Sequence, residues 1–387
     1  MQYKEYELGE LLPFEQPTAY IVKSTDYNDS YSTPVLTAGK TFILGKTNEE
    51  DGIFDQLPVI IFDDFTTATQ FVNFKFKVKS SAMKILHINT DLVIPKYIFY
   101  RLQTIQFDHS THKRYWIQSY SKIKVSIPSL DEQSRIVSRI DELFSELDKA
   151  VDTLNTTKEQ LAVYRQAVLK DAFSNIPREM YKPLKLVMEE MPQNGLYKSK
   201  SFYGEGNPIL RIDGFYDGEV VPNYEYKKVR LEAEEIKKYA LHIGDIVVNR
   251  VNSMSYLGKC ALIRNLEEPT IFESNVMRFR LDKQQIDLEY AMYYLSTSFG
   301  RHELIKNAKQ AVNQASINQT DVGNALIPIP KDLEAQRNIA QKISAHIAVC
   351  NNIEQGIDTA FAQADAMRQS ILKQTFEGKF ERKNNVS

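Results

Sequence analysis

The sequence predicts an α/β mixed (α+β) fold, in which two α/β domains are separated by two long helices packed as an antiparallel coiled coil. The main observation is an internal repeat, because the helical pattern from Glu132 to Phe173 returns without a gap 203 residues later, with Ile136 matching Ile339. Strand-like runs precede both copies. We therefore expect a pseudo-twofold internal repeat with a domain at 1–128, a helical segment at 129–175, a second domain at 176–330 and a second helical segment at 331–387.

The helical segments carry an apolar pattern with the 3.5-residue period of a coiled-coil seam. Helices of this length are too long to cover one small domain, so we expect the two copies to pack on each other. The predicted seam and partner-binding residues are Ile136, Ile140, Leu143, Leu147, Leu154, Leu161, Ile339, Ile343, Ile353, Ile357, Met367 and Ile371. Such a pattern is also typical of plain structural scaffolds.

Composition limits the class of protein. The chain has 387 residues, of which 43% are apolar, enough for two ordinary cores. No apolar stretch has the length of a membrane span and the polar start is no signal peptide, so we expect a soluble, cytoplasmic protein. A net charge of −2 argues against a protein that simply coats nucleic acid, so any DNA contact must come from a local patch. The two cysteines have no metal-ligand spacing, and we predict no metal site.

The globular parts read as mixed α and β. Residues 59–62 form a short apolar run typical of a buried strand, and residues 74–79 alternate strictly, which predicts a strand that shows three lysines on one face. Those lysines favour either a solvated face or a face that follows phosphates. Residues 96–102 have a helical, aromatic pattern whose counterpart is 289–295, so the globular parts repeat as well, though more loosely.

Catalytic signatures are absent from the sequence. The run Ala-Gly-Lys-Thr at 38–41 resembles the end of a phosphate-binding loop, but Pro34 occupies the place of the first glycine. His302 and Glu303 begin like a zinc-peptidase helix, yet Lys306 stands where the second histidine is needed. Asp217 with Glu235 and Lys237 imitates a nuclease set inside a charge-rich run, where a solvated helix face is the simpler interpretation.

The residues resemble the specificity (S, HsdS) subunits of type I restriction-modification enzymes over essentially the whole chain. In the first half, residues 33–45 (TPVLTAGKTFILG), 59–67 (VIIFDDFTT) and 76–83 (FKVKSSAM) are similar to a target-recognition domain of the type IC branch. In the second half, residues 208–211 (PILR), 244–253 (GDIVVNRVNS) and 257–259 (LGK) are similar to another such domain. Ile-Pro at 127–128 followed by Glu-Gln at 132–133 resembles the family's helical spacer, and the second copy departs slightly with Ala-Gln at 335–336.

The resemblance implies a non-catalytic, DNA-binding subunit that recognises a bipartite double-stranded site, with one half-site for each domain. The helices would act as a ruler and would dock two methyltransferase (M, HsdM) subunits, and restriction (R, HsdR) subunits would join them. Adenine-N6 methylation from S-adenosylmethionine and ATP-driven cleavage with Mg would belong to those partners, and this chain would bind no cofactor itself.

The family's loops, matched residue by residue, imply sixteen DNA-binding candidates. Their types suit the task, since Arg and Lys can pair with guanine or phosphate and Asn can bond to adenine. They are Lys40, Lys46, Thr66, Thr67, Lys79, Ser80, Lys113 and Arg114 in the first domain, and Lys198, Lys200, Arg211, Asn249, Arg250, Asn252, Ser253 and Lys259 in the second. Asp63, Asp64 and Asp245 are interpreted as turn and cap residues rather than metal ligands.

Two other classes of function remain open on the sequence. The chain could be a coiled-coil adaptor without a DNA function, or a nuclease that acts through Glu235 and Lys237.

Overall fold

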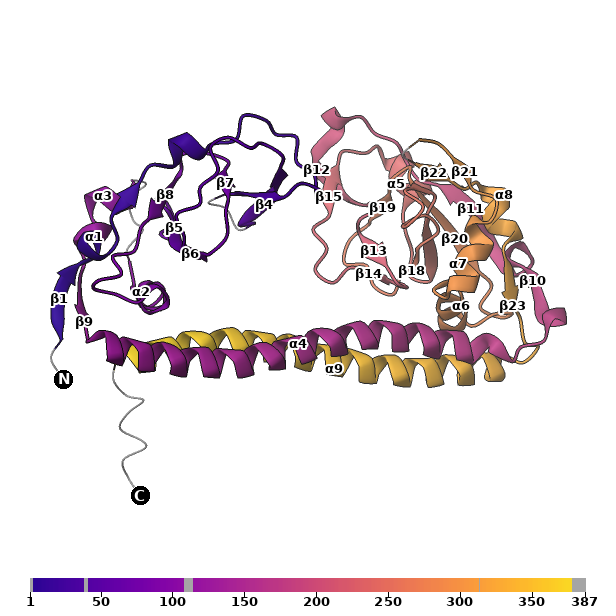
Figure 1. Ribbon diagram of the computed structural model, residues 1–387. Helices are drawn as coiled ribbons and strands as arrows, with labels where there is room; N and C mark the ends of the chain where they lie inside the picture. Colours follow the sequence, from indigo (N-terminus) through magenta and orange to yellow (C-terminus); the bar gives the residue numbers. More distant parts are fainter. Residues whose placement is uncertain (1–2, 38–40, 108–113, 313, 378–387) are drawn as a thin grey trace, which may run out of the picture. The chain divides into compact units, whose positions relative to one another are not determined.

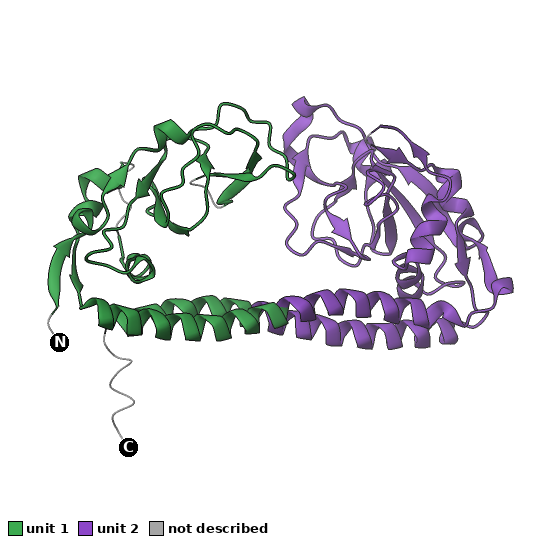
Figure 2. Cartoon of the chain, viewed as in Figure 1, with its two compact units in different colours: residues 1–154, 359–387 green, residues 155–358 purple. Residues whose placement is uncertain are grey.

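The computed structural model describes residues 3–37, 41–107, 114–312 and 314–377. The chain forms two compact units, and each unit takes part of both long helices (Figure 2). Unit 1 combines residues 1–154 with 359–387, and unit 2 consists of residues 155–358. Among the helices of the described residues, none combines the length and apolar character that a bilayer crossing requires.

Unit 1 contains three small sheets and short helices beside the long ones (Figure 1). Its strands are β1 (Lys4–Glu7), β2 (Phe14–Glu15), β3 (Thr33–Leu36), β4 (Ile43–Thr47), β5 (Val59–Asp63), β6 (Thr69–Val72), β7 (Lys77–Val78), β8 (Met83–Leu86) and β9 (Lys124–Ile127). Its helices are α1 (Leu8–Leu11), α2 (Pro95–Leu102), α3 (Tyr115–Gln118), the first part of α4 (Leu130–Ser174) and the last part of α9 (Leu333–Phe376), with 3₁₀ turns η1 (Pro17–Tyr20) and η2 (Tyr120–Lys122).

Unit 2 holds the remainder of both long helices and a larger set of strands. These are β10 (Tyr181–Pro183), β11 (Met188–Asn194), β12 (Tyr203–Leu210), β13 (Phe215–Tyr216), β14 (Glu219–Val220), β15 (Lys227–Val229), β16 (Asp245–Asn249), β17 (Val251–Asn252), β18 (Cys260–Leu262), β19 (Ile271–Phe272), β20 (Val276–Leu281), β21 (Lys309–Gln310), β22 (Ala315–Ser316) and β23 (Leu326–Pro328). Its other helices are α5 (Ala233–Tyr239), α6 (Leu288–Leu295), α7 (Ser298–Ile305) and α8 (Gln319–Asn324), with 3₁₀ turns η3 (Arg178–Met180), η4 (Leu184–Val187) and η5 (Lys200–Phe202).

The two units share one sheet topology. Unit 1 has a four-stranded sheet in the order β2-β8-β5-β6, a three-stranded sheet β4-β3-β7 and the pair β1-β9. Unit 2 repeats this plan with β11-β20-β16-β18, β15-β12-β19 and β10-β23. A parallel strand pairing recurs at the same place, between β3 and β7 and between β12 and β19, while the other strand pairs described for these sheets are antiparallel. The predicted mixed fold with an internal repeat is therefore confirmed.

The central strand of each four-stranded sheet separates two cores. In β5, Ile60 and Phe62 pack with Tyr97 of α2, while Ile61 faces the core shared with the three-stranded sheet. Ile246, Val247 and Val248 divide between two cores in the same way in unit 2. Since successive side chains of a strand point to opposite faces, a strand buried on both faces must be apolar throughout. This explains the apolar runs in the sequence.

The lysines of residues 74–79 do not form the exposed face that the alternation predicts. Lys77 is only 1% exposed. Its Nζ lies 3.2 Å from the Glu49 carboxylate and donates to the backbone carbonyls of Asp51 and Gly52. Lys77 therefore stabilises the turn before β5 from inside the fold. The prediction that all three lysines are exposed is wrong, because these local acceptors compensate the buried charge of Lys77.

The long helices run antiparallel within each unit. In unit 2, Lys158 of α4 pairs with Asp358 of α9 at 2.8 Å, and Arg165 donates to Asn351 at 2.7 Å. In unit 1, Arg368 of α9 pairs with Asp148 of α4. Residue numbers rise along α4 as they fall along α9, which defines the direction. The predicted packing of the two helices on each other is confirmed.

The seam between the helices passes through only part of the predicted set. Ile140, Leu147, Leu154 and Leu161 on α4 and Ile343, Ile357 and Ile371 on α9 are buried or half-buried, and Ile136, Leu143 and Ile339 are half-buried as well. Ile353 and Met367, however, are 42% and 54% exposed. Their placement in the seam is wrong because the inward positions belong to the next residues, Glu354 and Arg368, which pair with Arg165 at 2.6 Å and with Asp148.

A buried glutamine ties each globular part to the start of the helix that follows it. Gln133 is fully buried, its Oε1 accepts from the backbone N–H of Ile94 at 2.8 Å, and its Nε2 donates to the carbonyls of Leu92 and Pro128, both at 3.0 Å. Ile94 is the N-cap residue of α2. The glutamine thus satisfies the N–H group of the N-cap residue of α2 and two buried carbonyls of the segments that precede α2 and α4.

Gln336 makes the same three bonds in unit 2. Its Oε1 accepts from the N–H of Asp287, the N-cap of α6, at 2.8 Å, and its Nε2 donates to the carbonyls of Gln285 and Pro330 at 3.3 and 2.9 Å. The extra residue after Pro330 does not change the arrangement. Both junctions are built alike although the domains have diverged.

The end of the opposite long helix completes each domain. Phe173, near the end of α4, packs against Tyr290 and Tyr294 of unit 2 with ring centroids 5.2 and 5.3 Å apart. Phe376, at the end of α9, packs against Tyr97 of unit 1 at 5.4 Å. Each domain therefore holds the start of one long helix and the end of the other.

We predict that Gln133→Leu lowers the free energy of unfolding by about 1–3 kcal/mol, because it leaves buried backbone groups without hydrogen-bond partners. Urea unfolding followed by circular dichroism measures the change. Gln369→Leu is the matched control, since Gln369 lies on the exposed surface of α9. Equal stability of the two variants would contradict the role of Gln133.

Candidate nucleic-acid interface

Three loops meet at one edge of each unit, where strands of the two larger sheets end. In unit 1 the loops after β3 and β7 are joined by a bond from the N–H of Lys79 to the carbonyl of Leu36 at 2.8 Å. In unit 2 the N–H of Glu273 donates to the carbonyl of Leu210 at 3.0 Å, and that of Arg250 donates to Asn275 at 2.9 Å. Most of the predicted DNA-binding residues lie on these loops.

The loop after β5 is fixed by two aspartates. The Asp63 carboxylate accepts from the N–H groups of Phe65 and Thr66 at 2.8 and 3.2 Å. Asp64 is 2% exposed, lies 3.2 Å from Lys84 Nζ and accepts from the N–H of Trp116 at 2.8 Å. These bonds give Asp63 the turn role that the sequence predicts, whereas Asp64 ties the loop to β8 and to the start of α3. In the part of the chain described, no group of acidic, histidine or cysteine side chains is arranged to hold a metal ion.

This rigid loop presents its side chains outward. Phe65 is 48% exposed, Thr66 is exposed, and Thr67 has a φ of +57°, which turns the chain back into β6. The sequence interpretation overlooked Phe65, whose position between Asp64 and Thr66 was the available signal. An exposed aromatic ring on a fixed loop can stack on a base or contact a thymine methyl group.

The other described candidates of unit 1 lie close by in the fold. Lys46 is half-buried on β4, Lys79 is half-buried with its Nζ 5.8 Å from the centre of the Tyr27 ring, and Ser80 and Arg114 are exposed. Lys40 and Lys113 lie outside the described residues. The edge of unit 1 thus offers both hydroxyl and cationic groups.

In unit 2 the equivalent loop follows β16. Asn249 is 0% exposed and donates from Nδ2 to the carbonyl of Ile212 at 3.4 Å, so its side chain is not available to a ligand at the surface. The prediction for Asn249 fails in this structure because the strand remains buried to its last residue. Arg250 is half-buried, donates to the carbonyl of Ser274 at 2.8 Å, and burial lowers the pKa of its guanidinium.

The rest of the loop after β16 is held against α7 by hydrogen bonds. Arg301 donates to the carbonyl of Leu257 at 2.9 Å and also to that of Met254. Asn252 is half-buried and Ser253 is exposed. Lys259 Nζ lies 5.0 and 4.9 Å from the centres of the Tyr216 and Tyr256 rings, so two aromatic faces hold its charge in place.

The three remaining basic candidates of unit 2 differ in whether their side chains are free to contact a ligand. Arg211 Nε donates to Glu273 at 3.1 Å, which neutralises its charge locally. Lys198 pairs with Glu235 at 2.7 Å and lies 4.6 Å from the Phe202 ring centre, whereas Lys200 is exposed.

Glu235 has a structural role at the start of α5. Its carboxylate accepts from the N–H of Glu232 at 3.0 Å in a capping box, and the hydrogen bond from Lys198 holds the pKa of Glu235 below its usual range. Both oxygens of the carboxylate are engaged. The nuclease hypothesis therefore loses its proposed metal-binding or acid–base residue.

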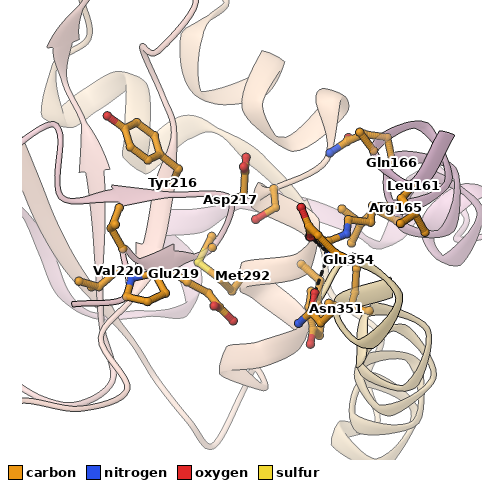
Figure 3. Close-up of a pocket in the computed structure, with 18 of the residues that line it drawn as sticks. Leu161, Arg165, Gln166, Tyr216, Asp217, Glu219, Val220, Met292, Asn351 and Glu354 are labelled. Carbon is orange, nitrogen blue, oxygen red and sulfur yellow. Dashed lines mark hydrogen bonds and ion pairs between the residues drawn. The ribbon is translucent and has the colours of Figure 1, made fainter. Parts of the chain in front are cut away.

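A pocket of about 540 Å³ in unit 2 lies between the helix pair and the β13–β14 hairpin (Figure 3). Two arginines that line it are paired, since Arg165 bonds to Glu354 at 2.6 Å and Arg264 bonds to Glu289 at 2.6 and 2.8 Å. Met292, Val220 and Leu161 supply apolar walls. This arrangement provides packing and ion pairs.

Comparison with known proteins identifies the family to which both halves of the chain are similar. A model described as the Type I restriction modification DNA specificity domain matches residues 2–161 and 187–360. The chain is 32% identical over 373 residues to the specificity subunit of the type I restriction enzyme EcoR124I/EcoR124II of Escherichia coli, and the match covers 90% of this chain and 88% of that protein. It is 25% identical over 382 residues to the MjaVIII specificity subunit of Methanocaldococcus jannaschii, covering 92% and 87%.

A solved structure supports the fold. A chain from a study titled "Structural basis underlying complex assembly and conformational transition of the type I R-M system" aligns with a TM-score of 0.65 and 17% identity, covering 97% of this chain and 98% of that one. The family model and the EcoR124I/EcoR124II relative favour a DNA-specificity role over an adaptor without a DNA function. Since the family model covers both halves and a relative matches along nine tenths of the length, the chain belongs to the DNA specificity subunits of type I restriction-modification systems, the non-catalytic component of those enzymes.

Proposed function

We propose that this specificity subunit recognises a bipartite double-stranded DNA site, with unit 1 reading one half and unit 2 the other. The observation that carries the proposal is one strand framework used twice with different residues at its loop edge. Thr66 of unit 1 occupies the position of Asn252 in unit 2, on the segments that follow the buried strands β5 and β16. A shared framework with unlike contact groups suits two unlike half-sites.

The contact residues that we propose are those the structure leaves accessible at these edges. An Arg or Asn side chain can read a base edge in the major groove, and Lys or hydroxyl groups position the phosphate backbone. We propose Lys46, Phe65, Thr66, Thr67, Lys79, Ser80 and Arg114 for the first half-site, and Lys200, Arg250, Asn252, Ser253 and Lys259 for the second. Arg211 and Lys198 would position loops through their acidic partners, Glu273 and Glu235.

The long helices would set the gap between the half-sites and dock the partners. Both α4 and α9 contribute to both units, so a change in their length alters the connection of the two. The internal repeat supports docking of two identical methyltransferase (HsdM) subunits, because two copies of one protein need two similar surfaces. Restriction (HsdR) subunits would complete the assembly in the cytoplasm, and S-adenosylmethionine, ATP and Mg would act in those partners.

Mapping of N6-methyladenine in DNA from cells that express this chain with its methyltransferase subunit tests the proposal. We expect methylation at one sequence made of two specified halves and an unspecified gap of fixed length. Methylation at a continuous site, or at no defined sequence, would contradict a bipartite function.

We predict that Arg250→Lys and Asn252→Ala each weaken recognition of one half-site, because each removes a directional hydrogen-bonding group, worth about 1–3 kcal/mol per base pair. Fluorescence anisotropy of the methyltransferase complex on DNA with either half-site altered measures the loss. Arg337→Lys on α9 is the control, since Arg337 lies outside the loop edge. Equal weakening toward both half-sites would oppose the assignment.

We also predict that one heptad inserted after Leu154 and one after Asp358 widens the gap by about three base pairs. Seven residues add about 10.5 Å of helix and preserve the phase of the seam, and B-DNA rises about 3.4 Å per base pair. Methylation mapping reads the new gap. Insertion into α4 alone should abolish methylation, since the two helices would then differ in length. An unchanged gap in the double insertion would contradict the proposal that helix length sets the gap.

A further inference from the structure

A third segment lies parallel to β3 and β7 at the loop edge of unit 1. The N–H of Val22 donates to the carbonyl of Val78 at 3.0 Å, and Ile21 forms a parallel bridge with Val78. Strand β7 itself runs parallel to β3. Because the carboxyl ends of parallel strands meet at one edge of a sheet, Lys23 leaves this sheet beside Lys79, one of the proposed contact residues.

Unit 2 repeats this arrangement. The N–H of Leu196 donates to the carbonyl of Phe272 at 3.0 Å, and Leu196 forms a parallel bridge with Glu273. Strand β19, which ends at Phe272, runs parallel to β12 (Figure 1). Tyr197 therefore leaves the sheet beside the turn after β19, whose carbonyl groups accept hydrogen bonds from Arg250.

Lys23 and Tyr197 occupy equivalent positions. Each follows the residue whose N–H bonds to the short parallel strand, and Val22 and Leu196 lie equally far in the sequence before the ends of β3 and β12. Both side chains are accessible, since Lys23 is exposed and Tyr197 is 77% exposed. One backbone position thus carries a cationic group in unit 1 and an aromatic ring in unit 2.

In unit 1 an ion pair holds the backbone of this segment. The N–H groups of Lys23 and Ser24 donate to the Glu49 carboxylate at 2.8 and 2.9 Å. The same carboxylate lies 3.2 Å from Nζ of the buried Lys77. These bonds use the backbone of Lys23 and leave its exposed side chain in solvent.

In unit 2 close packing and an ion pair hold the residues on either side of Tyr197. The N–H of Gly195 donates to the carbonyl of Val276 at 3.0 Å, and a Cβ atom at this glycine would collide with the backbone at the end of β19. Lys198 pairs with Glu235 at 2.7 Å. The Tyr197 ring projects from a backbone that is fixed on both sides, which lowers the entropy cost of placing the ring against a ligand.

Duplex DNA limits what such a side chain can contact. The faces of the bases are covered by stacking, so a ring in the major groove meets the edges of base pairs, where the thymine methyl is the apolar group. An ammonium group at the same position suits a phosphate, which carries charge but no sequence information.

We propose that Tyr197 is a specificity-determining residue of the second half-site, whose ring packs on the methyl group of a thymine, and that Lys23 binds a phosphate at the first half-site. The proposed function, on which this inference rests, supplies the two half-sites. The same backbone position therefore reads sequence in unit 2 and only positions the DNA in unit 1.

Fluorescence anisotropy of the methyltransferase complex on the mapped site, with each thymine replaced in turn by uracil, tests the contact of Tyr197. Uracil pairs as thymine does but lacks the methyl group. We expect one replacement, in one half-site, to weaken wild-type binding about fourfold, the effect of one buried methyl group. The same replacement should leave binding by the Tyr197→Ala complex unchanged.

The ring itself accounts for a larger loss. Tyr197→Ala should bind the intact site about tenfold more weakly, whereas Tyr197→Phe, which keeps the ring, should stay within about twofold of wild type. Tyr3→Ala is the matched control, since Tyr3 is 51% exposed and precedes β1, which pairs with β9 before α4. Circular dichroism confirms that each variant folds.

Salt dependence tests the contact of Lys23. Lys23→Ala should lower the slope of log affinity against log salt concentration by about one, and it should weaken binding to all sequences alike. Lys4→Ala is the control, since Lys4 is exposed on β1.

The proposal is overturned if wild type and Tyr197→Ala respond alike to uracil at every thymine of the site. A loss with Tyr197→Phe as large as with Tyr197→Ala, or a salt slope that Lys23→Ala leaves unchanged, would also overturn it. A wild-type complex that methylates no bipartite sequence would instead remove the proposed function itself, and this inference with it.

Discussion

The structure depends on buried backbone groups that lie just before α2 and α6 and just before the long helices. Each junction has one N–H group and two carbonyl groups, and a glutamine of the long helix that follows satisfies all three. Gln133 and Gln336 each provide one acceptor and two donors, and both are fully buried. An amide side chain suits the task because it offers both functions without a charge to desolvate. The orientation of each domain on its helix follows from these bonds.

The sequence predicted the elements that depend on periodicity. The 203-residue repeat and the heptad pattern located both long helices, and the apolar runs located β5 and β16. The pattern could not place Ile353 and Met367, because it selected the apolar residue at each position, whereas the inward residue is the charged one that follows, Glu354 or Arg368. At these positions the inward residues form ion pairs, such as Glu354 with Arg165. Their energy depends on a partner 189 residues away, which local periodicity does not contain.

The candidate site was predictable by residue type but not by accessibility. Asn249 and Arg250 are neighbours with suitable side chains, yet one is enclosed at the end of a buried strand and the other reaches the loop. Similarly, Lys77 and Lys79 alternate along one segment, and only Lys79 remains partly exposed. Burial is set by the packing of whole sheets, so composition and spacing could identify the loops while the fold had to select among their residues.

The repeat in the sequence and the compact unit in the fold do not have the same boundaries, because the end of each long helix packs on the domain of the other repeat. A repeat runs from a domain to the end of its own helix, but Phe173 of the first repeat lies against Tyr290 of the second, and Phe376 of the second lies against Tyr97 of the first. A single repeat on its own would therefore leave the phenylalanine at the end of its helix exposed, and its domain would lack the phenylalanine that completes its core. Two repeats within one chain supply both the phenylalanine and the domain that receives it in a fixed ratio, and each long helix then completes the domain of the other repeat.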